Sequence, residues 1–271
     1  MFFKDIKCPN CGTYHDPTLN ECQTCHKSNE LFALNRLPKR AVFLHPIAQM
    51  GVFLVGFAYV GMLFAELFFS ICLKNVPLKD ADKNILLLSL TYISMFAGII
   101  VIPLLTRRKY FLSRYKNGID YIYGIAYAAT IVSVGTILGA LIALIHESGN
   151  NVNQVAAESI VKNYPLISIL VLGILGPICE EFTYRVGLYS FLRRINKYLA
   201  FAVTVVVFAF IHFDFTAKDL VNELWSLPSY LACGFILTLA YEHRGPACSM
   251  VAHVSYNIFA CLLIMAKGYG Q

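Results

Sequence analysis

The chain has 271 residues, of which 58% are hydrophobic and only 14% carry a formal charge, and its mean hydropathy is +0.61. A soluble domain of this length needs more charge to cover its surface, so lipid rather than water must face many of the apolar side chains. The net charge of +6 does not indicate nucleic-acid binding, because the basic residues lie in short connections between apolar segments and not along one face or tail.

The first segment of the chain is polar and contains two Cys-x-x-Cys pairs separated by ten residues, Cys8 with Cys11 and Cys22 with Cys25. Four thiolates at this spacing can close a tetrahedral zinc site, and a metal is the natural way to order a segment too small to bury a core. A redox pair would need a βαβ context, and a cytosolic N-terminus argues against disulfides. We therefore predict a structural zinc ribbon over residues 1–30, open to docking a protein partner, and a linker over residues 31–46.

The opening segment lacks the pattern of a cleavable signal peptide, so the first apolar segment is expected to act as an uncleaved anchor. Seven segments are long and apolar enough to cross a hydrocarbon core of about 30 Å as helices. They are approximately residues 47–73, 84–105, 120–145, 164–192, 198–213, 224–242 and 246–266. We predict an all-α polytopic membrane domain of seven or eight transmembrane helices over residues 47–271. Residues 146–163 form a polar connection with an amphipathic stretch at 152–161.

The connections differ in their content of lysine and arginine, and this difference sets the expected orientation. Six basic residues precede the first segment, five lie between the second and third, three follow the fourth, and Arg244 follows the sixth. The connections on the other side hold only six in total. We therefore expect a multi-pass protein of the cell membrane with a cytosolic N-terminus and seven passes.

The fourth segment contains three ionisable residues, which are costly inside a bilayer and are candidates for function. Glu181 and Arg185 are four residues apart on one helical face and can neutralise each other. Glu180 points about 100° away and has no partner on its own helix. A desolvated carboxylate of this kind is a usable general base.

Two later segments carry further polar groups. His212 ends the fifth segment, and His253 and Asn257 share one face of the seventh at a spacing of four residues. A neutral imidazole can bind a metal or hold a water, and an asparagine amide can donate to a developing oxyanion. Their depths along the helices allow all three to meet Glu180.

Three patterns in this order resemble the CAAX protease and bacteriocin-processing (CPBP, or Abi) family of intramembrane proteases. They are Glu-Glu-x-x-x-Arg at 180–185, Phe-x-x-x-His at 208–212 and His-x-x-x-Asn at 253–257, and the resemblance covers about residues 164–266. It implies that Glu180 is the catalytic carboxylate and His212 its partner in activating water. It further implies that His253 and Asn257 stabilise the oxyanion and that Glu181 with Arg185 braces the helix.

The resemblance implies an endopeptidase that hydrolyses membrane-associated or lipidated peptides. Glu180, His212 and His253 could also hold an active-site zinc, and the sequence does not choose between a metal and a glutamate-activated water. Proteins similar to this family also act in bacteriocin self-immunity, and the same pattern of residues is compatible with a membrane scaffold or with an ion- or proton-coupled transporter. The presence of all three patterns favours the enzyme, because a scaffold needs none of them.

Overall fold

The computed structural model describes residues 6–8, 10–15, 22–26, 46–73, 75–146, 151–193 and 195–269. The predicted linker lies almost entirely outside the described residues. Helices dominate the described part, and the only strands in it are the short antiparallel pair β1 (Ile6–Lys7) and β2 (Tyr14–His15) of the N-terminal segment. The predicted all-α membrane class, preceded by a small N-terminal segment with a cysteine cluster, is confirmed.

Each predicted apolar segment corresponds to a helix or to a run of helical stretches. In chain order they are α2 (Pro46–Phe68) with η3 (Phe69–Leu73), α3 (Asp80–Arg114), α4 (Gly118–Ala143), α5 (Val152–Asn163), α6 (Pro165–Ser168), η4 (Ile169–Leu175), α7 (Gly176–Glu180), η5 (Glu181–Tyr189), α8 (Ser190–Arg193), α9 (Lys197–Phe210), α10 (Leu220–Arg244) and α11 (Pro246–Tyr269). The amphipathic stretch predicted at 152–161 is α5.

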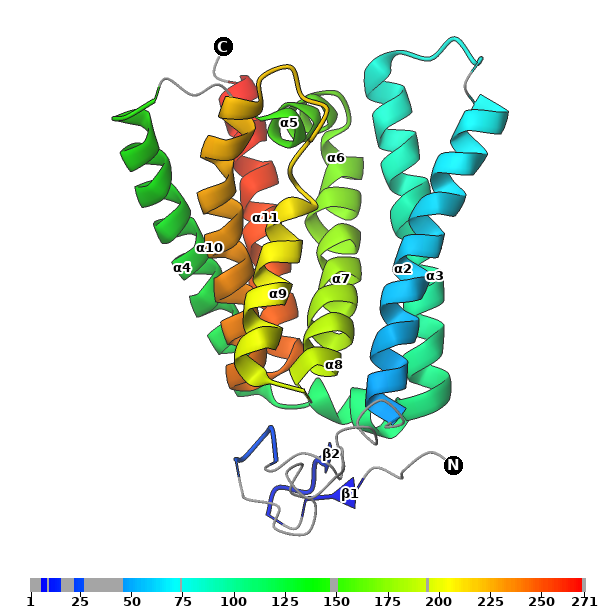
Figure 1. Cartoon of the computed structure of the whole chain (residues 1–271), viewed down its shortest axis with the longest axis vertical. Coiled ribbons are helices and arrows are strands. Elements are labelled where there is room, and N and C mark those ends of the chain that lie inside the picture. The colour runs from blue at the N-terminus through cyan, green and yellow to red at the C-terminus, as the bar shows by residue number, and fades with distance from the viewer. Residues whose placement is uncertain are drawn as a thin grey trace.

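Within the residues that the structure describes, five helical segments are long and apolar enough to cross a membrane: Gly51–Leu73, Gly118–Ala143, Pro165–Arg193, Leu220–Arg244 and Pro246–Lys267. Helix α9 has 14 residues and rises about 21 Å, which is less than the hydrocarbon thickness. The chain from α9 therefore reaches the start of α10 through a non-helical connection, as Figure 1 shows. Helix α3 has 35 residues and packs antiparallel along α2.

The helices form a bundle with two distinct ends. The N-terminal strands lie at one end, and α5 and the C-terminus lie at the other (Figure 1). Helices α2 and α3 form a hairpin at one side of the bundle, α4 lies at the opposite side, and the remaining long helices lie between them. We call these ends the ribbon end and the distal end.

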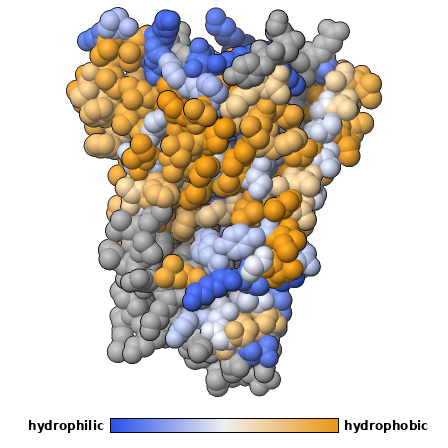
Figure 2. Space-filling model, turned by 180° about the vertical axis from the view of Figure 1, so that it is seen from behind, coloured by the Kyte–Doolittle hydropathy of each residue, from blue (hydrophilic) through white to orange (hydrophobic). Residues whose placement is uncertain are grey.

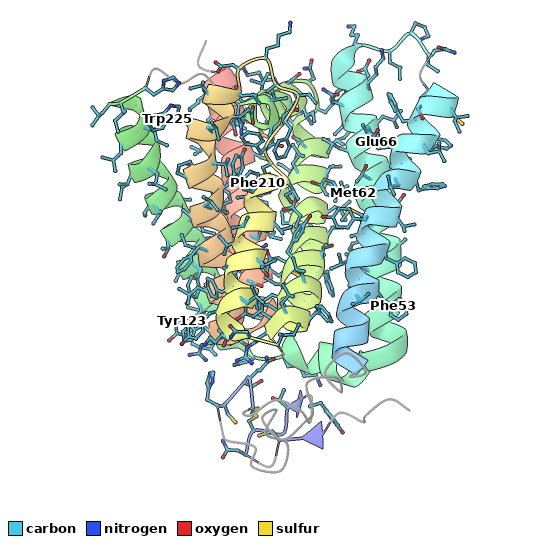
Figure 3. The ribbon with its side chains drawn as sticks, in the orientation of Figure 1. Phe53, Met62, Glu66, Tyr123, Phe210 and Trp225 are labelled. Atoms are coloured by element: carbon cyan, nitrogen blue, oxygen red, sulfur yellow. The ribbon has the colours of Figure 1, made fainter. Side chains whose placement is uncertain are left out.

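The flank of the bundle is apolar and its ends are polar. Figure 2 shows hydrophobic side chains over the flank and hydrophilic ones at the distal end. On α2 the large apolar side chains of Phe53 and Leu63 are 58% and 68% accessible. Contact with lipid is more favourable for such side chains than contact with water. Tyr123 and Trp225 lie toward opposite ends of the bundle (Figure 3), where aromatic side chains anchor a protein at the two membrane interfaces.

Small residues let the hairpin approach the core of the bundle. A Cβ at Gly51 of α2 would lie 2.6 Å from the carbonyl oxygen of Gly187 in η5, so the two backbones pack closely only because both residues are glycines. A Cβ at Gly176 of α7 would lie 3.0 Å from Cζ of Tyr92 in α3. This second contact brings α3 against α7 one helical turn before Glu180.

Candidate active site

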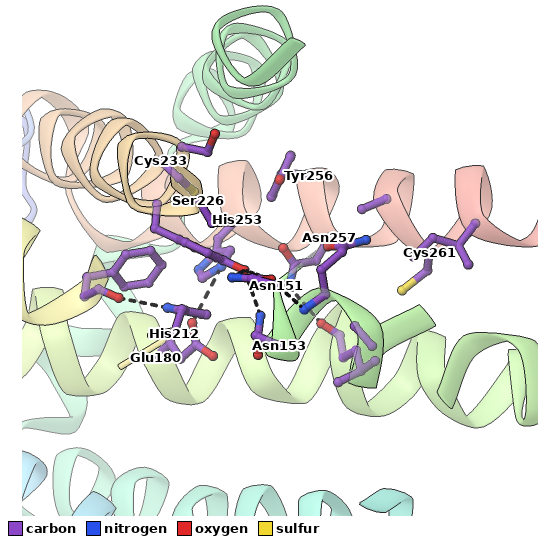
Figure 4. A pocket seen from close by; sticks show the side chains of 18 of the residues that line it. Asn151, Asn153, Glu180, His212, Ser226, Cys233, His253, Tyr256, Asn257 and Cys261 are labelled. Atoms are coloured by element: carbon purple, nitrogen blue, oxygen red, sulfur yellow. Dashed lines mark hydrogen bonds and ion pairs between the residues drawn. The ribbon is translucent and has the colours of Figure 1, made fainter. Parts of the chain in front are cut away.

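The predicted residues Glu180, His212, His253 and Asn257 line one cavity of about 430 Å³ (Figure 4). They come from α7, from the residues just after α9, and from α11, and the walls are completed by α3, α4, α5 and α10. Glu181 and Arg185 are buried beside the cavity and are not part of its lining. The cavity reaches from the middle of the bundle toward the distal end, where Trp225 and Ile264 form its upper wall.

The two carboxylate oxygens of Glu180 have different neighbours. Tyr92 of α3 donates a hydrogen bond of 3.2 Å from its hydroxyl to Oε1. Oε2 lies 3.7 Å from Nε2 of His253. The hydrogen bond from Tyr92 fixes the orientation of the carboxylate, so that Oε2 faces the imidazole. The distance between Oε2 and Nε2 is too long for a good direct hydrogen bond.

His253 is buried between the two consecutive glutamates. Its Nδ1 lies 2.9 Å from Oε1 of Glu181, and a carboxylate in an ion pair can only accept, so Nδ1 carries the proton and donates it. In the neutral ring, Nε2 is then the unprotonated nitrogen and faces Glu180. Glu181 therefore sets the tautomer of the histidine that faces its neighbour in the chain.

Arg185 holds Glu181 in place. Its Nη1 donates to Oε1 of Glu181 at 2.8 Å, as the spacing of four residues predicted, and its Nη2 donates to the carbonyl oxygen of Gly234 in α10 at 3.3 Å. The guanidinium also lies 4.3 Å from the centre of the Phe208 ring. Both partners of the ion pair are fully buried, so the charge of each depends on the other.

His212 is oriented by the end of α9. Its backbone N–H bonds to Ala209, three residues back, and the carbonyl of Phe208 instead accepts a 2.8 Å hydrogen bond from Nδ1 of the His212 ring. In the neutral ring Nε2 is then the unprotonated nitrogen, available to the cavity. The ring of Tyr230 from α10 stacks on it with centroids 4.7 Å apart and an interplanar angle of 15°.

Asn257 is tied to an irregularity in the fourth apolar segment. In η4 the Gly176 N–H bonds to Val171, five residues back, and the next position is Pro177, which has no N–H. The carbonyl of Leu172 consequently lacks the helical donor it would otherwise have, and Nδ2 of Asn257 donates to it at 2.9 Å. One hydrogen of this amide is thus structural, and the second remains available for chemistry.

Two further residues of note were not predicted: Tyr92, which lines the cavity, and Glu223, which lies outside its lining. Tyr92 is one of 16 tyrosines and lies 88 residues from Glu180, so nothing in the sequence distinguishes it. Glu223 is buried in the first turn of α10, where its carboxylate accepts the backbone N–H groups of Val152 at 2.8 Å and Asp214 at 3.2 Å. A glutamate at the start of an apolar helix was the signal that could have revealed it.

The four N-terminal cysteines lie together as predicted, and their sulfur atoms are all within 4.8 Å of one another. The Cys8–Cys25 and Cys11–Cys22 sulfur distances are both 3.6 Å. Tetrahedral zinc with Zn–S bonds of about 2.3 Å places its ligands about 3.8 Å apart, whereas a disulfide needs about 2.05 Å. The cluster therefore fits a metal ion and not a pair of disulfides.

The two Cys-x-x-Cys turns are built alike. The residue after the second cysteine bonds through its N–H to the carbonyl of the first cysteine, which joins Gly12 to Cys8 at 2.9 Å and His26 to Cys22 at 2.7 Å. Both residues have positive φ, 71° for Gly12 and 57° for His26. This conformation costs a non-glycine residue about 1–2 kcal/mol, so a metal ion bound by the four cysteines would help to maintain the His26 turn.

The sequence also allowed a metal ion at the active site. Within the described part of the chain, the cysteines are the one group of three or more ligating side chains whose ligand atoms converge within 4.8 Å. Glu180, His212 and His253 line the same cavity but do not form such a group.

Comparison with known proteins confirms the resemblance found in the sequence. Residues 162–259 match the family described as Type II CAAX prenyl endopeptidase Rce1-like, and this segment contains Glu180, Glu181, Arg185, His212, His253 and Asn257. The match runs from the end of α5 into α11 and leaves out the cysteine cluster, the α2–α3 hairpin and α4.

Three curated relatives are proteins of Lactococcus lactis subsp. lactis (strain IL1403). UPF0177 protein YvdC is 24% identical over 138 residues, which are 51% of this chain and 50% of the relative. UPF0177 protein YxdF is 36% identical over 33% of this chain and 45% of the relative, and UPF0177 protein YbdJ is 37% identical over 33% and 35%. The chain thus spans half or less of the length of these relatives. No solved structure matches.

Proposed function

We propose that this multi-pass membrane protein, related to the CAAX-type proteases through residues 162–259, is an intramembrane endopeptidase that uses a Glu180-activated water. The observation that carries the proposal is the position of His253, held by Glu181 at 2.9 Å on one nitrogen and facing Glu180 at 3.7 Å on the other. One nitrogen of this buried histidine is held by a carboxylate, and the other faces a general base. Burying such polar groups costs folding free energy, so a purely structural role would not explain the arrangement.

The water would lie between Oε2 of Glu180 and Nε2 of His253. Both atoms are acceptors, so the water donates one hydrogen to each and turns a lone pair toward the substrate carbonyl carbon. As the C–O bond forms, the proton passes to Glu180 and the carbonyl oxygen takes the negative charge. When the C–N bond breaks, Glu180 returns that proton to the leaving amine, which leaves a new carboxyl group and a new amino group.

A donor for the oxyanion is present in the same cavity. It is the second Nδ2 hydrogen of Asn257, whereas the Nδ1 proton of His212 is held by the Phe208 carbonyl and leaves Nε2 of that ring as an acceptor. In this scheme Glu180 and His253 activate the water, Asn257 acts on the oxyanion, and His212 presents an acceptor to the cavity. The scheme moves His253 from the oxyanion, where the resemblance implied it acts, to the activation of water.

Substrate and topology complete the proposal. The substrate is a membrane-associated or lipidated peptide, and the basic residues of the connections favour a cytosolic ribbon end. The zinc-binding segment then lies on the cytosolic side, where it can dock a protein partner, and the cavity opens toward the opposite side through the distal end.

The proposal is tested with the purified full-length chain in lipid nanodiscs and a set of membrane-anchored peptides, with products identified by mass spectrometry. We expect wild-type protein to yield paired fragments with a new carboxyl and a new amino terminus. Glu180→Gln should abolish cleavage, whereas Glu66→Gln, an exposed glutamate on α2, should not change it. Full activity of Glu180→Gln would refute the proposed base.

A further inference from the structure

The lining of the cavity is almost free of charge. Among the described residues that form its wall, Glu180 is the only carboxylate and there is no lysine or arginine. The buried cation beside it, Arg185, is paired with Glu181 and does not belong to the lining. A charged group of a substrate would therefore enter a cavity that offers no counter-charge for an anion and only the catalytic carboxylate for a cation.

The distal end of the cavity is polar but neutral. Side chains from the start of α5 and from α10 form this region, which we call the amide mouth: Asn151, Asn153, Gln154, Ser226, Ser229 and Tyr230. Asn153 and Asn151 donate through Nδ2 to the Tyr230 hydroxyl at 3.0 and 3.2 Å. Figure 4 shows Asn151 and Asn153 between His212 and Asn257. Amides and hydroxyls of this kind both donate and accept, as the main chain of a peptide requires.

The depth of the cavity determines how many residues of an extended peptide lie against its uncharged wall. Its wall follows α11 from His253 to Ile264, a rise of about 16 Å. An extended peptide advances about 3.3 Å per residue, so a group three residues from the cleaved bond lies about 10 Å from it and still within the cavity. The terminal carboxylate of a substrate cleaved three residues from its end would thus be held in the uncharged space.

We infer that the cavity accepts an uncharged peptide segment, with about three neutral residues on the distal side of the cleaved bond, and binds its main chain at the amide mouth. The cleaved bond is internal, and both ends of the substrate lie outside the cavity. This inference rests on the proposed function, because it assumes that the cavity is where the peptide is cut. It gives the substrate class as a neutral peptide stretch and not a free C-terminus.

The test uses the full chain in nanodiscs and an internally quenched peptide of alanine, valine, leucine, serine and glycine, whose cleavage site is first mapped by mass spectrometry. Each residue near the cleaved bond is then replaced in turn by aspartate, lysine or the neutral asparagine. We expect aspartate or lysine within about three residues on the distal side to lower kcat/KM at least about 30-fold relative to asparagine. A peptide shortened so that it ends three residues after the cleaved bond should still be cleaved when its C-terminus is a carboxamide. The same peptide with a free C-terminal carboxylate should not be cleaved.

A charge placed in the mouth should change this preference. Asn153→Lys is expected to raise kcat/KM for the aspartate peptides about 10-fold relative to the neutral peptide. The matched control is Asn163→Lys at the other end of α5, where the asparagine bonds to Ser159 and lies outside the cavity lining, and it should have no such effect. Equal cleavage of charged and neutral peptides, or of the carboxylate and the carboxamide, would overturn the inference.

Binding of the same peptides, followed by fluorescence anisotropy, separates failure of this inference from failure of the proposed function. If wild-type protein cleaves nothing but binds the neutral peptide more tightly than its charged variants, and Asn153→Lys narrows the difference between the neutral and aspartate peptides, the neutral-peptide site stands and hydrolysis is wrong. If neither cleavage nor binding distinguishes the peptides, the inference is wrong.

Discussion

Nδ1 of His253 lies 2.9 Å from Oε1 of Glu181, so a residue that does not line the cavity determines which nitrogen of His253 faces it. The adjacent Glu180 meets the other nitrogen at 3.7 Å. Two consecutive glutamates thus have separate tasks, because the helix turns about 100° between them. One fixes an imidazole, and the other is left to act on water.

Removing Glu181 should damage stability and activity, and the two effects can be separated. Glu181→Leu leaves the Arg185 guanidinium buried without its carboxylate and should cost about 3 kcal/mol of unfolding free energy. Adding Arg185→Met removes the orphaned charge and should restore most of that loss in denaturation assays. Hydrolysis by the double variant should stay about 10–100-fold below wild type, because His253 has lost the group that orients it. Wild-type hydrolysis by the double variant would show that Glu181 only stabilises the helix.

Tyr92 should contribute to catalysis by positioning Glu180. Tyr92→Phe deletes the hydrogen bond to Oε1, and hydrogen bonds to charged groups contribute about 1.5–3 kcal/mol, so kcat should fall about 10–100-fold. Gly176→Ala should act in the same direction, because its Cβ would press on the Tyr92 ring. Tyr121→Phe is the control, since its hydroxyl bonds to the Tyr115 carbonyl outside the cavity. Unchanged kcat in Tyr92→Phe would exclude this role.

Asn257 should have a structural role that can be replaced and a catalytic role that cannot. Asn257→Ala leaves the Leu172 carbonyl without a donor and should lower stability by about 1–3 kcal/mol. Pro177→Ala supplies a backbone N–H five residues after Leu172 and should recover that stability in the double variant. Its hydrolysis should remain low. If the double variant regains activity, the second amide hydrogen of Asn257 does not act on the oxyanion.

Elemental analysis of purified protein should find one zinc per chain. Cys8→Ser with Cys11→Ser should remove it, because a tetrahedral site cannot persist with two of its four thiolates. His212→Ala and Glu180→Gln should retain it. A second zinc that disappears with His212→Ala would establish a metal at the active site and replace the scheme of a water activated by Glu180 alone.

Metal binding at the cysteines should depend on pH through two thiols with opposite shifts. Burial raises the pKa of Cys22 to about 12, so zinc must displace its proton at neutral pH. Burial would also raise the pKa of Cys11, but hydrogen bonds from Thr13 outweigh it and hold that pKa at about 6. Cys11 is therefore already a thiolate at pH 7 and gains a proton below pH 6. Calorimetry in buffers of different ionisation enthalpy should show fewer than four protons released per zinc at pH 7, with affinity falling as pH decreases. Release of four protons at pH 7 would contradict the lowered pKa of Cys11.

The parts of the site that follow from local spacing were predictable from the sequence. Glu181 and Arg185 meet because helical residues four apart share a face, and the cysteines meet because two tight turns bring paired thiols together. The helical segments followed from the length of the apolar runs. These features depend on one helix or one turn at a time.

The remaining features depend on contacts between helices. Tyr92 reaches Glu180 only because Gly176 admits the tyrosine ring, and no local pattern encodes that pairing. The bond from Asn257 to Leu172 arises from a change of hydrogen-bond spacing in η4, and periodicity does not reveal such a change. The contact of Glu223 with the start of α5 joins residues 71 positions apart.

A double-mutant cycle on Glu180 and His253 tests the proposed catalytic pair most directly. Single-turnover cleavage of one mapped peptide is measured for wild type, Glu180→Gln, His253→Gln and the double variant in nanodiscs. Residues that act as one unit are strongly non-additive, so both single variants and the double variant should fall to the same low rate. Losses that simply multiply in the double variant, or a His253→Gln variant as fast as wild type, would show that His253 does not act with Glu180 on the attacking water.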